Sequence, residues 1–196
     1  MTYCNKGLMP NLFPEGANQP LYNTVDAGLL FIVAVYEYYQ RTKKVDFVKE
    51  AYPVMKEIVS WYRRGTDFHI SMDQDGLITA GGDLEQVTWM DVTGKTIAPA
   101  CQEISYADLA AIVKESFCSR FWNEEKHCLK DVISGTAADE QIRCNQIWAV
   151  SMPFSILPRE QEKAVAETVF RKLYTKGCFA QAWSVGEILR VYDALR

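Results

Sequence analysis

The sequence has few of the residues that build metal and redox sites. Only two of its 196 residues are histidines, His69 and His127, and they lie far apart in the chain. His127 is followed by Cys128, but adjacent residues rarely bind one ion together. The six cysteines include no CxxC pair: Cys4, Cys101, Cys118, Cys128, Cys144 and Cys178. We therefore expect no metal and no cofactor. Reduced thiols in a soluble cytoplasmic protein are the simplest interpretation.

Long apolar runs and clusters of one charge are also missing. The longest apolar run, near residues 27–35, is too short to span a bilayer. The first residues, MTYCNKGLMPNLF, contain no charged region followed by a long apolar core, so they do not resemble a signal peptide. Net charge is −4, with Lys and Arg scattered. Neither a nucleic acid nor a membrane is therefore an expected partner.

The composition that is present suits one globular domain. The chain is 48% hydrophobic and 23% charged, and its length allows a sizeable core. No low-complexity segment or Pro/Ser-rich linker divides it. We predict a single domain over residues 1–196.

The first half of the chain predicts two helices of different kinds. Residues 23–41 open with capping residues, Asn23 first among them, and are apolar nearly all round in their first half. This pattern is typical of a helix buried on most faces. Residues 46–64 have apolar side chains at helical spacing, and Pro53 should bend this helix or mark a late first turn. Gly65 should end it.

The remaining segments predict four more helices and two hairpins. The helices are expected at residues 106–121, 145–157, 159–174 and 180–195, of which the second and fourth are mostly apolar. Hairpins are expected within residues 68–79, around Asp75-Gly76, and around residues 128–134.

Alternation of fully apolar and one-faced helices predicts an all-α fold with two concentric layers, an α/α toroid. The helices at residues 23–41, 145–157 and 180–195 would form the inner layer and be more buried than those between them. A solenoid or bundle is the alternative, although the sequence shows no fixed repeat.

One loop contains residues typical of an active site. In TWMDV, residues 88–92, Trp89 stands two positions before Asp91. A loop tryptophan is costly to leave in water, and loops on a scaffold often contain functional residues. The structural alternative is that Trp89 covers the side of a core and Asp91 caps the next helix.

Five motifs occur in an order that resembles a known family. They are GLMPNLFPEG (7–16), YNTVDAGLLFIVAVYEY (22–38), VTWMDV (87–92), IRCNQIWAVSMPFS (142–155) and AQAWSVGEILR (180–190). Together they resemble the C-terminal amylo-α-1,6-glucosidase domain of glycogen debranching enzymes, over most of the chain. That family is similar in fold to glucoamylase-like (α/α)6 barrels, which agrees with the toroid predicted from the helices.

The resemblance also implies that the chain is incomplete. A full domain of this family has twelve barrel helices, and two joins here connect segments abruptly. Segments are expected to be missing after about residue 99 and after about residue 175. The second would include the family's catalytic base, a glutamate, and no residue of this sequence matches it.

By resemblance, Asp91 is the general acid of an inverting glycoside hydrolase that removes the α-1,6-linked branch-point glucose. Such an enzyme separates a protonated carboxyl from a basic carboxylate by roughly 6.5–9.5 Å, which leaves room for water. Trp89 and Met90 lower the local polarity, which keeps a carboxyl protonated near neutral pH. Trp89 would also form a wall for the sugar ring.

Other residues are candidates for substrate binding, each with a structural alternative. Asp26 could bind sugar hydroxyls, or it could only be an acidic residue that the helix dipole stabilises. Asn23 could face the pocket, or it could only cap the helix. Gln181 and Trp183 could line a subsite, or Trp183 could be a core residue. We expect the loops that precede inner helices to bring Asp26, Trp89, Asp91 and Trp183 to one concave end of the ring.

Three classes of function remain open. The first acts on glycogen or a branched α-glucan oligosaccharide at α-1,6 linkages. The second is another (α/α)6 hydrolase, glucoamylase-like or trehalase-like, with a different linkage preference. The third is a non-catalytic helical module that binds glycan or protein. The sequence does not indicate an oligomeric state.

Overall fold

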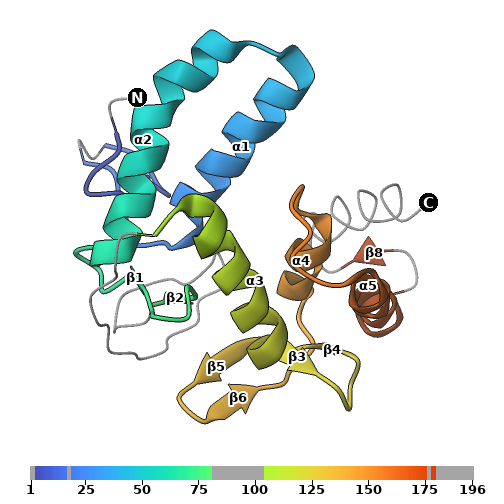
Figure 1. Ribbon diagram of the computed structural model, residues 1–196. Coiled ribbons are helices and arrows are strands. Elements are labelled where there is room, and N and C mark those ends of the chain that lie inside the picture. The colour runs from blue at the N-terminus through green and yellow to red at the C-terminus, as the bar shows by residue number, and fades with distance from the viewer. Residues whose placement is uncertain (1–2, 17–18, 81–103, 176–177, 180–196) are drawn as a thin grey trace. The chain divides into compact units, whose positions relative to one another are not determined.

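A computed structural model describes residues 3–16, 19–80, 104–175 and 178–179 (Figure 1). About half of these residues are helical, and the strands form only short antiparallel pairs. The prediction of a mainly helical fold is therefore confirmed for the described residues. The chain divides into two compact units, residues 1–104 and 105–196, and each is described separately.

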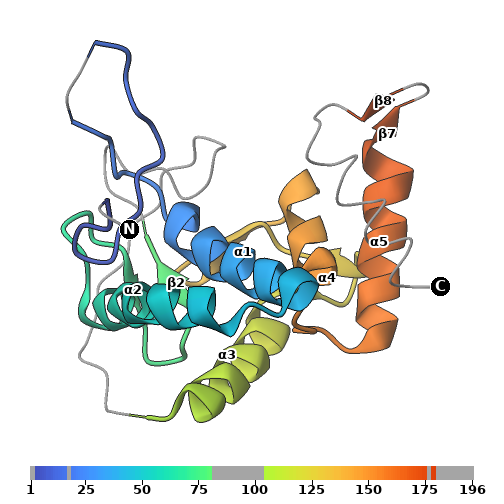
Figure 2. The same ribbon diagram turned by 90° about the horizontal axis from the view of Figure 1, so that it is seen from above.

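Two helices, α1 (Asp26–Thr42) and α2 (Val45–Arg64), pack side by side in the first unit (Figures 1 and 2). Lys43 joins them in the left-handed conformation, and its N–H donates to the carbonyl of Tyr39. The α2 helix continues through Pro53, and it ends at Gly65 as predicted, with φ of +96° there. The two predicted helices are confirmed within a few residues at each end.

The core of the first unit forms where the amphipathic face of α2 meets the start of α1. The buried side chains are Leu8, Val25, Ile58, Tyr62 and Ile70. Leu8 reaches this core through a tight turn at residues 5–8, in which the Leu8 N–H donates to the Asn5 carbonyl. Lys6 and Gly7 both have positive φ, +47° and +77°, as a type I′ turn requires.

A small hairpin follows α2, as predicted. Strand β1 (Ser71–Met72) pairs with β2 (Ile78–Thr79). The turn contains Gly76 at φ of +79°, and the Asp75 side chain accepts from the Leu77 N–H.

The second unit begins with α3 (Tyr106–Phe121), whose bounds match the prediction. Ser105 caps it: its hydroxyl oxygen accepts from the Asp108 N–H and its hydroxyl donates to the Asp108 carboxylate. This side-chain oxygen satisfies a backbone N–H that has no partner within the helix.

Two hairpins follow α3 where one was predicted. Strands β3 (Trp122–Asn123) and β4 (Cys128–Leu129) form the first, and β5 (Val132–Ser134) and β6 (Ala137–Asp139) the second. Arg143 holds the second hairpin together, because its guanidinium pairs with both Asp131 and Asp139. The predicted hairpin, around residues 128–134, instead spans β4 and β5, which belong to different hairpins. These strands are too short to show alternation in the sequence.

The helix predicted at residues 145–157 is much shorter. Cys144–Ile147 form a 3-10 helix, α4 spans Trp148–Ser151, and the chain then leaves the helical conformation. Pro153 explains the difference: it disfavours the helical conformation in the residue before it, and Met152 has an extended ψ of 149°.

The last described helix is α5 (Arg159–Leu173), which ends one residue before its predicted end. Its apolar face packs with α4 and β4 around a core of Leu129, Ile147, Val150, Leu157, Val165 and Val169. Strands β7 (Tyr174–Thr175) and β8 (Cys178–Phe179) pair after it. The helix predicted at residues 180–195 lies outside the described residues.

The prediction that α1 is more buried than the outer helices is confirmed against α3, which buries no residue, but not against α2. Only Gly28 and Val35 are buried in α1, whereas α2 buries Ala51, Ile58 and Tyr62. Leu29 and Tyr38 are both 38% exposed, because α2 covers only one face of α1. A closed ring of helices is not established by the described residues. The two positions at which segments are predicted to be missing lie within or beside undescribed residues, so both stay predictions. The single domain also stays a prediction.

Candidate functional site

Two of the six predicted site residues, Asn23 and Asp26, are described, and they lie at the start of α1. Asp26 is half-buried in the first helical turn. The backbone N–H of Asn23 donates to the Asn11 side-chain oxygen over 3.2 Å. A pair of backbone bonds links Asn11 and Leu12 to Leu21. The segment that contains GLMPNLFPEG is thereby held beside the segment that leads into α1.

Asn23 is not the N-cap, contrary to the prediction. The cap position is Val25, and no side chain caps the helix there. Val25 cannot serve as a side-chain cap because its side chain has no oxygen. It is a buried core residue with 6% exposure. Packing therefore determines where α1 begins, and Asn23 lies two residues before the cap position.

Tyr62 of α2 holds the start of α1 in place. Its hydroxyl donates to the Val25 carbonyl over 2.7 Å, and its side chain is only 1% exposed. Gly28 allows this approach, because a Cβ at that position would lie 3.2 Å from the Tyr62 hydroxyl and 3.2 Å from Ile58 Cγ2. The residue after Val25 is Asp26, so Tyr62 fixes the backbone that presents this carboxylate.

The Tyr62 hydroxyl is held in its neutral form. Burial raises its pKa far above the ordinary value, and the negative charge of Asp26, together with that of Cys4 when it ionises, raises it further. Burial also raises the pKa of the Cys4 thiol, with a contribution from the charge of Glu57. The two groups beside the start of α1 thus remain protonated at neutral pH.

We expect Tyr62→Phe to destabilise the protein by about 1–3 kcal/mol at neutral pH, because it leaves the Val25 carbonyl without its buried donor. A raised folded-state pKa means that stability is intact below the unfolded value of about 10 and falls as pH rises above it. Tyr62→Phe should lose less stability over that alkaline range. Urea unfolding at several pH values measures both effects.

Tyr52→Phe is the matched control, since Tyr52 lies on the same helix and is 48% exposed. It should behave as wild type at every pH. Equal stability of Tyr62→Phe and Tyr52→Phe would contradict the role of the Val25 bond.

The other four predicted site residues, Trp89, Asp91, Gln181 and Trp183, lie outside the described residues. The predicted convergence of Asp26, Trp89, Asp91 and Trp183 therefore remains a prediction. Thr24 was missed by the sequence analysis: it is 4% exposed, and its hydroxyl oxygen has no hydrogen-bond partner. The signal available in the sequence was its position next to Asn23, a predicted site residue. The lack of a partner is unusual, since a buried hydroxyl normally has one.

Two further classes of feature were searched for within the described ranges. No group of three His, Cys, Asp or Glu side chains there could hold a metal ion. No helix there is both long and apolar enough to cross a membrane.

Comparison with known proteins identifies the family. The profile of the amylo-alpha-1,6-glucosidase family matches residues 1–102 and 94–176. These ranges include the start of α1 and the TWMD segment, and together they cover most of the chain. The chain therefore belongs to the amylo-alpha-1,6-glucosidase family, a family of glycoside hydrolase domains related to glycogen debranching. No curated protein and no solved structure matches it.

Proposed function

We propose that the complete protein removes α-1,6-linked branch-point glucose from a glycogen-type glucan, with Asp91 as the general acid. The observation that carries this proposal is the family match, which includes residues 87–92 with Trp89 and Asp91. A carboxyl beside an indole and a thioether is in a setting that favours the protonated form. Such a carboxyl can protonate the leaving oxygen while a second carboxylate activates water.

The proposed substrate contacts follow from the same assignment. Asn23 and Asp26 would hydrogen-bond sugar hydroxyls from the start of α1, and Trp89 would form an apolar wall. Gln181 and Trp183 would line the same subsite, although they lie beyond the matched range, which ends at residue 176. The fold proposed for the whole is the (α/α)6 toroid, and the exposed apolar residues of α1 support it, because a further layer of helices would cover them.

We also propose that segments are missing from this chain after about residues 99 and 175. The family match supports the first position, because its two ranges meet at residues 94–102. The segment missing at the second position would contain the catalytic base. Sequencing the transcript across codons 99–100 and 175–176 tests this directly. A transcript in which codon 100 directly follows codon 99, and codon 176 directly follows codon 175, would contradict the proposal.

The functional test compares glucose release by the complete protein from an α-1,6-branched dextrin and from linear maltohexaose. Preferential release from the branched substrate is expected. Equal rates on both would favour a broader (α/α)6 hydrolase. Binding of the dextrin without release of glucose would favour a non-catalytic glycan-binding module.

Asp26→Asn should raise KM about tenfold and leave kcat little changed, because it removes a contact made equally in the ground and transition states. The matched control is Asp46→Asn, which changes the corresponding first-turn acid of α2, whose side chain is 97% exposed. It should keep the wild-type KM. A wild-type KM in both variants would show that Asp26 only interacts favourably with the helix dipole and does not bind substrate.

A further inference from the structure

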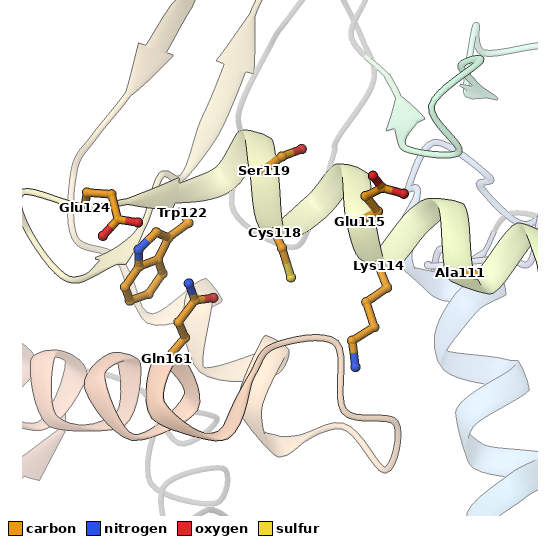
Figure 3. A pocket seen from close by; sticks show the side chains of 8 residues that line it. All are labelled: Ala111, Lys114, Glu115, Cys118, Ser119, Trp122, Glu124 and Gln161. Carbon is orange, nitrogen blue, oxygen red and sulfur yellow. The ribbon is translucent and has the colours of Figure 1, made fainter.

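A groove of about 680 Å³ lies between α3 and α5 within the second unit (Figure 3). One wall is formed by α3, β3 and the turn that follows β3, with Lys114, Glu115, Cys118, Trp122 and Glu124 along it. Gln161, in the first turns of α5, forms the other. None of these residues belongs to the site proposed above.

Trp122 lies at one end of the groove (Figure 3). It is the first residue of β3, directly after α3, and it pairs with Leu129 of β4. Its ring lies 6.5 Å from the His127 ring, and part of its surface packs on the core of the second unit. The rest of the indole faces the groove opposite Gln161 (Figure 3). A half-covered indole is a ready surface for an apolar face of a ligand.

Gln161 supplies an unused hydrogen-bond acceptor. Its amide points from α5 toward Trp122 and Cys118, and its Oε1 atom is buried without a hydrogen-bond partner (Figure 3). A buried acceptor in this state is destabilising. Rotation of the amide toward the groove would let a ligand hydroxyl donate to Oε1.

The charges around the groove restrict the ligand. The Lys114 ammonium donates to the Ser155 carbonyl over 3.1 Å, and the Cys118 thiol donates to the Ile156 carbonyl over 3.2 Å. Both bonds therefore fasten α3 to the loop between α4 and α5. Two exposed carboxylates lie nearby: Glu124 is beside Trp122, and the carboxylate of Glu115 points away from Gln161 (Figure 3). Carboxylates repel an anion and accept hydrogen bonds from hydroxyls. An uncharged polyhydroxyl compound with one apolar face fits this combination.

We propose that the groove binds a linear α-1,4-glucan chain, one sugar of which stacks on Trp122 while its hydroxyls donate to Gln161 and Glu124. This inference rests on the proposed function for the choice of an α-glucan. A chain anchored here would keep a large, branched substrate attached to the protein between hydrolytic events. Binding of two segments of one molecule increases the effective concentration of the second.

Fluorine NMR of the 5-fluorotryptophan-labelled complete protein tests the groove, because each tryptophan gives its own signal, including the five in this chain. Trp→Phe substitutions assign the signals, and maltohexaose is the ligand. The Trp122 signal should shift saturably, while those of Trp61 and Trp148 should not. Gln161→Ala should weaken the binding read at Trp122 about threefold to tenfold. Glu167→Gln, on an exposed position of α5, is the matched control and should have no effect.

Other results would overturn the inference, and they separate it from the proposed function. Shifts at Trp89 and Trp183 without a shift at Trp122 would reject the groove and leave the proposed catalytic site intact. No shift at any tryptophan, together with no glucose release, would reject both. An equal response to cellohexaose would contradict an α-glucan site. A Trp122 signal that moves with protein concentration alone would show that a second copy occupies the groove.

Discussion

Asp91→Asn in the complete protein should lower glucose release from an α-1,6-branched dextrin by about 10²–10⁴-fold, the usual contribution of general acid catalysis. The amide keeps the shape and hydrogen bonding of the carboxyl but has no proton to deliver to the leaving oxygen. Because proton transfer matters in the transition state, kcat should fall while binding of a non-hydrolysable sugar changes only within about threefold. The alkaline limb of the pH profile should disappear with the carboxyl.

Asp46→Asn serves as the control for this variant, since it makes the same chemical change at an exposed carboxylate of α2. It should hydrolyse the dextrin at the wild-type rate. A wild-type rate in Asp91→Asn would remove the acid assignment. A large loss in both variants would point to damage to the fold, which circular dichroism would then show.

Gly7→Ala should destabilise the first unit by about 2–5 kcal/mol. Ala is strained in the left-handed conformation that Gly7 adopts, at φ of +77°, by about 1–2 kcal/mol. The added Cβ would also lie 2.4 Å from Trp61 Cβ, so the turn must move away from α2. Displacement of a packed turn costs about a further 1–3 kcal/mol. Urea unfolding followed by circular dichroism measures the sum.

Gly135→Ala separates the two contributions. Gly135 has φ of +60° in the β5–β6 hairpin, and a Cβ there would meet no atom within 4 Å. It should therefore lose only the conformational part, about 1–2 kcal/mol. If Gly7→Ala costs no more than Gly135→Ala, the contact of the turn with Trp61 is not tight.

Sequence patterns predicted elements best where a local signal marked at least one end. Residues 106–121 form α3, and Ser105 caps its start. The α2 helix ends at Gly65, because glycine can adopt the positive φ found there. The segment at 145–157 failed because its apolar pattern was given more weight than Pro153, which ends the helix after Ser151. Local signals of this kind act within a few residues, so they do not depend on the rest of the fold.

The burial of α1 and the candidate site could not be predicted in the same way. Apolar residues nearly all round α1 indicate that it can be buried, but only the neighbours that pack on it decide whether Leu29 and Tyr38 are covered. The role of Tyr62 depends on a contact with Val25 across 37 positions of the sequence, which no local pattern encodes. The family resemblance supplied Asp91 and Trp89, and physical reasoning supplied only the chemistry that suits them.

The bond between Tyr62 and Val25 determines how a pH profile of this protein should be interpreted. The start of α1 is fastened by a phenol that stays neutral until strongly alkaline conditions, and its partner is a carbonyl that does not titrate. Acidification from neutral pH therefore leaves that fastening unchanged and alters only groups that ionise in the acid range, such as imidazoles and carboxyls. Activity lost on the acid side can then be assigned to the protonation of a catalytic or substrate-binding carboxylate while the backbone that presents Asp26 keeps its position.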